Sequence, residues 1–162
     1  MEFRKSHPDA ELMFVGDGWY LGELKTDFEN APEVHFAGVQ GGKTLAGLYA
    51  DADFLLFPST TDTFGNVVVE ALASGTPAIV SDKGGPQDIV FEKGCGYILP
   101  SDSPEAWLRQ LEKCVELKRD ENAYQKLREN AYARSKDYTL EQAVKAQWNF
   151  YKKVYRYSYR HQ

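Results

Sequence analysis

The residues that most clearly suggest a ligand site lie in one segment, residues 58–77. Two carboxylates stand near its centre, Asp62 and Glu70, with Gly65 between them. The apolar run after Gly65 predicts a helix that begins near Asn66, where unpaired backbone N–H groups point outward. Such a helix start attracts phosphate, and a carboxylate further along the same helix could accept hydrogen bonds from ribose hydroxyls. The segment therefore indicates a site for phosphate and ribose.

Short apolar runs alternate with helical patterns and would position this segment. The runs are continuous, which is typical of strands that are covered on both faces in a parallel sheet. The expected strands are 12–15, 34–37, 54–57, 78–80 and 96–99. The expected helices between them are 19–30, 44–50 and 66–74, the last ended by Gly75 in a left-handed conformation. Ligands of such sheets bind at the carboxyl ends of the strands, which is where segment 58–77 begins.

The pattern becomes helical from Ser103 onward. Ser103 is expected to cap a helix whose first residue is Pro104, and further helices are expected at about 122–136 and 140–155. We therefore predict an α/β fold, a Rossmann-like doubly wound parallel sheet with C-terminal helices. The expected division is an incomplete Rossmann-like domain, residues 1–138, followed by a C-terminal helix or tail, residues 139–162.

Composition and charge exclude several classes of function. The 162 residues are 43% hydrophobic and 27% charged, which is ordinary for a soluble globular protein. A formal net charge of −5 argues against non-specific binding of nucleic acid. Cys95 and Cys114 lack the spacing of a zinc site, the sequence has no membrane-spanning run, and we expect no signal peptide. We expect a cytoplasmic protein with no metal site and no nucleic-acid partner.

Segment 58–77 resembles the donor-binding signature of retaining GT-B glycosyltransferases of the family 4 type (group 1). That signature reads P-S-x-x-E-x-F-G-x-x-x-x-E-A-x-A-x-G-x-P. Further landmarks are similar and in order, at residues 15–18, 36–38, 48–53, 81–85 and 94–97. The resemblance implies the C-terminal, donor-binding domain of an enzyme that moves a hexose, mannose or glucose, from a nucleotide-diphosphate sugar to a hydroxyl acceptor.

The same resemblance implies a role for each residue of the segment. Glu70 would hold the ribose hydroxyls of a UDP- or GDP-sugar, and Asp62, the expected catalytic residue, would lie beside the donor sugar. The nucleobase would stack near Val39. The other donor-binding residues would contact the sugar hydroxyls and the diphosphate, mainly through the backbone: Thr63, Phe64, Gly65, Asn66 and Val67. No metal or other cofactor is implied, because protein groups take the place of a metal at the diphosphate.

Two departures from the family pattern lead to further expectations. Asp62 stands where the family usually has glutamate, whose side chain is one methylene longer. The family also has an earlier strand, loop and helix whose basic residues clamp the donor phosphates, and an N-terminal acceptor domain. We therefore expect a fragment that is inactive alone. Without the central first strand, strands 12–15 and 54–57 are expected either to pair directly or to leave open apolar edges.

Other interpretations of the same residues stay open. The chain could be a stand-alone, non-catalytic module that binds nucleotides or proteins. Asp62 and Glu70 could also be solvated acids with no special role. Residues 41–44, Gly-Gly-Lys-Thr, resemble the end of a P-loop, but the first glycine of that motif would fall on Ala37. Residues 84–86 form either a simple turn or a loop that approaches the donor sugar.

The basic and aromatic C-terminal stretch, residues 145–162, also allows two interpretations. Trp148, Tyr151 and Tyr155 could pack against the domain with the lysines in water, which is the interpretation we favour. A basic aromatic helix could instead contact an anionic membrane or a lipid-linked acceptor.

Overall fold

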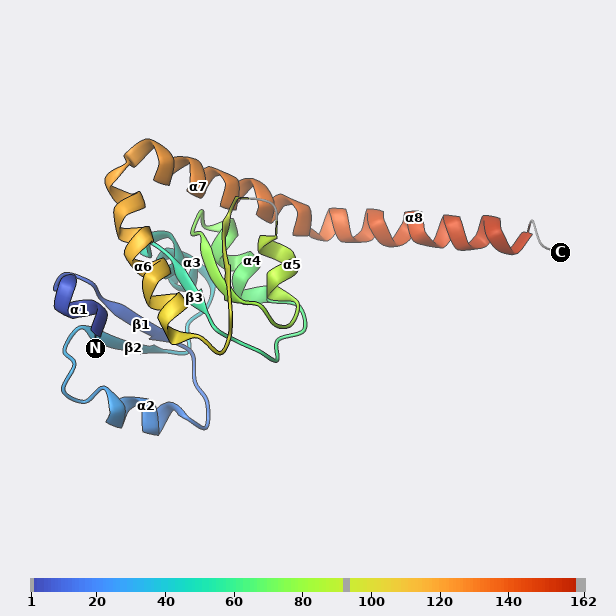
Figure 1. Ribbon diagram of the computed structural model, residues 1–162. Coiled ribbons are helices and arrows are strands. Elements are labelled where there is room, and N and C mark those ends of the chain that lie inside the picture. Colours follow the sequence, from blue (N-terminus) through green and yellow to red (C-terminus); the bar gives the residue numbers. More distant parts are fainter. Residues whose placement is uncertain (1, 92–93, 160–162) are drawn as a thin grey trace. The chain divides into compact units, whose positions relative to one another are not determined.

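The computed structural model describes residues 2–91 and 94–159 (Figure 1). The chain divides into two compact units, Met1–Leu48 and Tyr49–Gln162. Both units contain parallel strands connected through helices, which is the α/β class that the sequence predicts.

The first unit is built on a pair of parallel strands. β1 (Leu12–Val15) pairs with β2 (Val34–Gly38), and Phe14 stands opposite Phe36 in the ladder. The two rings stack with their centroids 5.2 Å apart, so an aromatic contact links the two strands of this ladder. The helices of this unit are α1 (Glu2–Ser6), α2 (Leu21–Asp27) and the first part of α3 (Gly42–Asp51).

The second unit holds a three-stranded parallel sheet. β4 (Ala78–Ser81) lies between β3 (Leu55–Phe57) and β5 (Gly96–Leu99), and all four residues of β4 are buried. That burial on both faces explains why the β4 sequence does not alternate between apolar and polar residues. The core contains side chains from the sheet, from Cys95 just before β5, and from the helices α4 (Asn66–Ala73), α5 (Pro86–Val90) and α7 (Glu121–Ser135): Val68, Leu72, Ala78, Val80, Ile89, Val90, Cys95 and Ala131.

Two long helices complete the body of the second unit. The Ser103 hydroxyl accepts a hydrogen bond from the Ala106 N–H, 3.3 Å away, and so caps α6 (Pro104–Arg119) as the sequence predicts. α7 (Glu121–Ser135) packs on α4 and is followed by a short 3₁₀ turn, η1 (Lys136–Tyr138). The Arg134 guanidinium donates to the carbonyl of Ile89 across 2.8 Å, which joins the end of α7 to α5.

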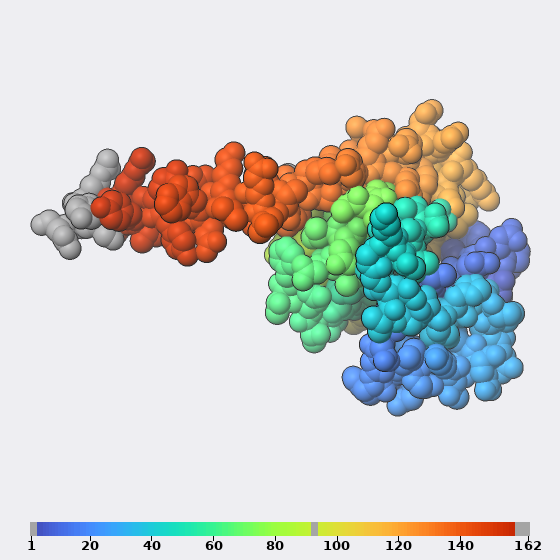
Figure 2. All heavy atoms as spheres, turned by 180° about the vertical axis from the view of Figure 1, so that it is seen from behind, coloured from blue at the N-terminus to red at the C-terminus, as the bar shows by residue number. Residues whose placement is uncertain are grey.

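The last helix, α8 (Leu140–Tyr159), differs from the packed helix that the sequence analysis favoured. Every residue from 140 to 157 is exposed, including Trp148 at 62%, Tyr151 at 53% and Tyr155 at 64%. α8 extends beyond η1, away from the rest of its unit (Figures 1 and 2). The favoured packing of these aromatic side chains against the domain is therefore wrong for this structure, because α8 follows the end of α7 outward instead of returning over the sheet.

The five expected strands are all present, but they form two ladders. β1 pairs with β2 within the first unit, and β3 pairs with β4 within the second. Within the part of the chain that the structure describes, β1 and β3 each have a paired strand on one side only. The expectation that strands 12–15 and 54–57 either pair directly or leave open apolar edges concerns the relation between the two units, and it stays a prediction.

Candidate functional site

The predicted helix start at Asn66 is where α4 begins, directly beyond the carboxyl end of β3. Gly65 caps the helix with φ of 100°, a left-handed conformation that glycine adopts without strain. Its carbonyl accepts from the N–H groups of Val68 and Val69 at 3.0 and 3.1 Å. Among the described residues, no acceptor faces the N–H groups of Asn66 and Val67. These two donors and the positive end of the helix dipole suit an anionic ligand.

The loop before α4 is held by its own side chains. Asp62 Oδ1 accepts from the Phe64 N–H at 2.8 Å, and the Asp62 N–H donates to Ser59 Oγ at 3.2 Å. Asp62 is half-buried, and its carboxylate has a second oxygen that is not used in this turn. The Phe64 ring meets the edge of the Tyr138 ring, with centroids 5.8 Å apart. The loop is therefore fixed before any ligand arrives.

The glycine loop after β4 lies against this turn. The Gly85 N–H donates to the Asp62 carbonyl at 3.0 Å. A Cβ on Gly84 would overlap the Asp62 carbonyl oxygen, and a Cβ on Gly85 would lie 2.9 Å from the Phe64 Cα. Residues 84–86 thus hold the loop after β4 against the turn at Asp62, and their approach to a donor sugar stays a prediction.

Glu70 has a partner that the sequence analysis did not name. It is exposed on α4, and its Oε2 accepts a hydrogen bond from the Tyr49 hydroxyl at 3.3 Å. Burial raises the pKa of Tyr49 to about 12, helped by the negative charge of Glu70. The buried hydroxyl of Thr76 donates to the Tyr49 carbonyl and holds that end of α3. The signal in the sequence was Tyr49 itself, a large aromatic residue inside the landmark 48–53.

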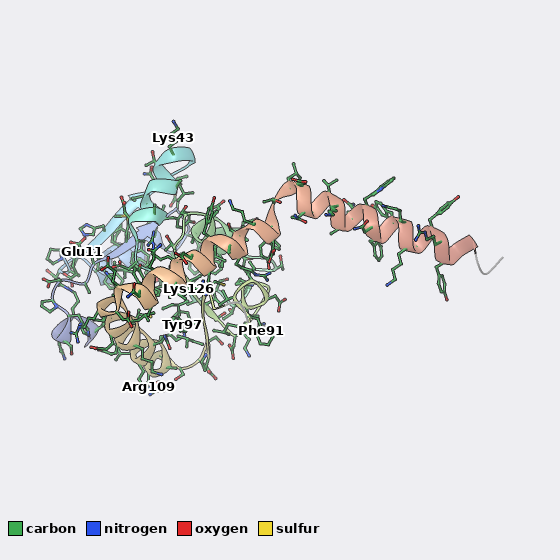
Figure 3. The ribbon with its side chains drawn as sticks, turned by 90° about the horizontal axis from the view of Figure 1, so that it is seen from above. Glu11, Lys43, Phe91, Tyr97, Arg109 and Lys126 are labelled. Carbon is green, nitrogen blue, oxygen red and sulfur yellow. The ribbon has the colours of Figure 1, made fainter. Side chains whose placement is uncertain are left out.

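The structure places seven of the eight predicted site residues in a single loop and helix start, residues 62–70. Gly65 is buried, Asp62 and Val67 are half-buried, and the remaining predicted residues there are exposed: Thr63, Phe64, Asn66 and Glu70. Val39 belongs to the first unit, where it follows the carboxyl end of β2 and is 75% exposed. Lys43 of the P-loop-like stretch is exposed in the first turn of α3 (Figure 3).

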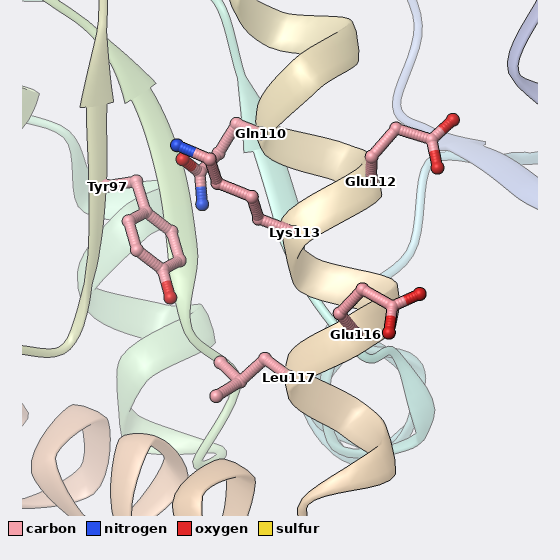
Figure 4. A pocket seen from close by; sticks show the side chains of 6 residues that line it. All are labelled: Tyr97, Gln110, Glu112, Lys113, Glu116 and Leu117. Atoms are coloured by element: carbon pink, nitrogen blue, oxygen red, sulfur yellow. The ribbon is translucent and has the colours of Figure 1, made fainter.

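A hollow of about 550 Å³ lies elsewhere, between β5 and α6 (Figure 4). Glu112 and Glu116 point away from Tyr97 in it, so its polar groups do not converge on one point. The hollow contains no residue of the predicted site. The described residues hold no group of three or more His, Cys, Asp or Glu side chains placed to bind a metal ion. No helix in residues 2–91 and 94–159 is both long and apolar enough to cross a membrane.

A single family match covers both the fold and the segment that holds the predicted site, residues 58–77. The family model described as "Glycosyl transferases group 1" matches residues 2–134, which is most of the chain. The chain therefore belongs to the group 1 glycosyl transferase family, and its fold is the Rossmann-like fold of GT-B glycosyltransferases.

The curated relatives that match this chain are also named as sugar transferases. A GDP-mannose-dependent alpha-mannosyltransferase of Mycolicibacterium smegmatis is 39% identical over 100 residues, which cover 62% of this chain and 26% of that protein. The sulfoquinovosyl transferase SQD2 of Arabidopsis thaliana is 40% identical over 85 residues, 52% of this chain and 16% of that protein. The chain thus spans about a quarter or less of the length of these two relatives.

Solved structures share the fold at lower identity. A glycosyltransferase from Rickettsia africae matches with a TM-score of 0.80 at 18% identity, over 94% of this chain and 42% of that one. Anabaena Alr3699/HepE in complex with UDP matches with a TM-score of 0.74 at 22% identity, over 92% of this chain and 42% of that one.

Proposed function

We propose that this chain forms the donor-binding part of a retaining glycosyltransferase, which moves a hexose from a nucleotide-diphosphate sugar to a hydroxyl acceptor. The observation that carries the proposal is the arrangement at the carboxyl ends of β3 and β4. There the α4 N–H groups, the Asp62 carboxylate and Glu70 share one loop and one helix.

Each part of this arrangement has a proposed role. The N–H groups of Asn66 and Val67 donate to a diphosphate oxygen, assisted by the helix dipole. Glu70 accepts hydrogen bonds from the ribose hydroxyls, and Asp62 uses its second oxygen on the donor sugar. Thr63 and Phe64 border the sugar, and Val39 contacts the nucleobase. We propose that the diphosphate is held by protein groups without a metal ion.

The relatives suggest two nucleobases for the donor nucleotide, uracil and guanine. The Mycolicibacterium relative is named for GDP-mannose, whereas the Anabaena structure holds UDP. Because the chain covers only part of each relative, we propose that it does not transfer hexose by itself. The acceptor side would be supplied by the part of those proteins that this chain does not match.

Calorimetric titration of the chain with UDP and with GDP tests the donor site. One of the two nucleotides should bind, with equal affinity in EDTA and in magnesium. Glu70→Ala should weaken that binding by about 1–3 kcal/mol, the scale of hydrogen bonds to a charged group, while Glu141→Ala on α8 should leave it unchanged. A folded chain that binds neither nucleotide, or binds one equally well without Glu70, would refute the proposed site.

A further inference from the structure

A buried hydroxyl connects the two loops that form the proposed donor site. Ser81 is the last residue of β4, and its side chain is fully buried. Its Oγ donates to the Ser59 carbonyl in the loop after β3, and it accepts from the Lys83 N–H, 3.4 Å away, in the loop after β4. This one hydroxyl therefore holds backbone groups of both loops.

Ser59 connects the Ser81 hydroxyl to Asp62. The Ser59 Oγ accepts from the Asp62 N–H at 3.2 Å and from the Thr61 N–H at 3.4 Å. Because Ser81 holds the Ser59 carbonyl, the hydroxyl that receives these two N–H groups belongs to a residue whose own backbone is fixed. The path from Ser81 to Asp62 thus consists of two hydrogen bonds that pass through one serine.

Both peptide groups that flank the Asp62 Cα are held in this way. Ser59 holds the Asp62 N–H, and the Gly85 N–H donates to the Asp62 carbonyl at 3.0 Å. The carboxylate is held as well, since its Oδ1 accepts from the Phe64 N–H at 2.8 Å. The direction of the second carboxylate oxygen is therefore set by the protein before a ligand arrives. A group that is already oriented loses little conformational entropy when it binds.

The end of β4 that carries Ser81 is also fixed on its β5 side. The Asp82 N–H donates to the Leu99 carbonyl at 2.8 Å, and Asp82 Oδ1 accepts from the Ser101 N–H at 3.1 Å. The Ser101 hydrogen bond lowers the pKa of the Asp82 carboxyl, which stays a charged acceptor at neutral pH. Ser81 therefore lies between a fixed sheet end and the loop that carries Asp62.

We propose that Ser81 is a positioning residue of the donor site, which acts through Ser59 and sets the direction of the Asp62 carboxylate toward the donor sugar. The inference rests on the proposed function, because it requires that Asp62 meets the sugar. Full burial keeps Ser81 itself away from any ligand. Its effect should therefore appear in the binding of the sugar and not of the nucleotide, whose proposed partners are the α4 N–H groups and Glu70.

Paired calorimetric titrations of the full chain separate these two contributions. UDP is compared with UDP-glucose, and GDP with GDP-mannose. Ser81→Ala should raise the dissociation constant of the sugar nucleotide roughly 2- to 10-fold, the effect of one lost hydrogen bond, and leave that of the free nucleotide unchanged. The matched control is Ser135→Ala, which also removes a buried serine hydroxyl, one that donates to the Tyr132 carbonyl at 2.8 Å. It should change neither dissociation constant.

A double-mutant cycle tests whether Ser81 acts through Asp62. Adding Ser81→Ala to Asp62→Asn should weaken the binding of the sugar nucleotide by less than adding Ser81→Ala to the unaltered chain. Ser59, at a half-buried position, offers a second pair of variants. Ser59→Ala should reproduce the selective loss, whereas Ser59→Thr, which keeps the hydroxyl, should bind as the unaltered chain does. Circular dichroism checks that each variant is folded.

The outcomes distinguish this inference from the proposed function. An unaltered chain that binds none of the four ligands would refute the proposed function and the inference with it. Weaker binding of the sugar nucleotide in Asp62→Asn, but not in Ser81→Ala, would overturn the inference alone. So would equal losses for nucleotide and sugar nucleotide in Ser81→Ala, an equal effect of Ser135→Ala, or additive effects in the double variant. Equal binding by Ser59→Ala and Ser59→Thr would also overturn it, because the connection would then not pass through the Ser59 hydroxyl.

Discussion

The Tyr49 hydroxyl donates to Glu70 Oε2 at 3.3 Å, across 21 positions of the chain. This bond joins the end of α3 to the outer face of α4. Tyr49 is itself held, since Thr76 donates to its carbonyl and Arg128 donates to the next carbonyl, that of Ala50, at 3.3 Å. The Glu70 carboxylate is therefore oriented by a side chain whose backbone is fixed at two successive peptide groups.

Removing this hydroxyl should weaken nucleotide binding without unfolding the chain. Tyr49→Phe keeps the ring and loses one hydrogen bond, which is worth about 0.5–1.5 kcal/mol, so the dissociation constant should rise roughly 2- to 10-fold. Tyr132→Phe, at an exposed position of α7, is the control. An unchanged dissociation constant in Tyr49→Phe, beside a clear loss in Glu70→Ala, would show that Glu70 needs no positioning partner.

The same pair predicts a dependence of stability on alkaline pH. The pKa of Tyr49 is raised to about 12 by burial and by Glu70, whereas a tyrosine in the unfolded chain titrates near 10. The stabilisation from protonated Tyr49 is therefore complete below pH 10 and is lost as the pH rises toward 12. Urea unfolding of the unaltered chain should show this loss, and Tyr49→Phe should show a smaller one. Equal pH slopes would contradict the raised pKa.

The contact between the glycine loop, residues 84–86, and the turn at Asp62 predicts a loss of stability when Gly85 is replaced. A Cβ at Gly85 would lie 2.9 Å from the Phe64 Cα, and the backbone around Thr63 would have to move. Gly85→Ala should lower the free energy of unfolding by about 1–3 kcal/mol and should also weaken nucleotide binding. The control is Gly47→Ala inside α3, where a Cβ meets nothing within 4 Å and should stabilise the helix slightly. Unchanged stability in Gly85→Ala would mean that the two loops are not in contact.

Much of the fold could be predicted because its signals are local. The continuous apolar runs identified all five strands, and β4, which is buried on both faces, has no reason to alternate. Gly75 and Ser103 identified a helix end and a helix start, and the structure has φ of 77° at the first and a side-chain cap at the second. The motif spacing likewise placed Asp62 and Glu70 on one loop and one helix.

The features that were missed depend on contacts between distant segments. Tyr49 meets Glu70 because of where α3 lies against α4, and no spacing within either helix encodes that position. The exposure of α8 was missed for a related reason. An amphipathic pattern is the same for a helix that packs on its own domain as for one that meets a different partner, so the sequence alone does not distinguish them.

Asp62 allows the sugar and nucleotide contributions to donor binding to be separated. Its Oδ1 accepts from the Phe64 N–H at 2.8 Å, and an asparagine can keep that bond through its side-chain oxygen while the negative charge is lost. Asp62→Asn should therefore bind the free nucleotide diphosphate as the unaltered chain does, but bind the corresponding sugar nucleotide severalfold more weakly. Asp62→Ala also loses the turn, and should cost about 1 kcal/mol of stability. Paired titrations with nucleotide and sugar nucleotide measure the difference, and equal affinities for the sugar nucleotide in Asp62→Asn and the unaltered chain would remove Asp62 from the sugar site.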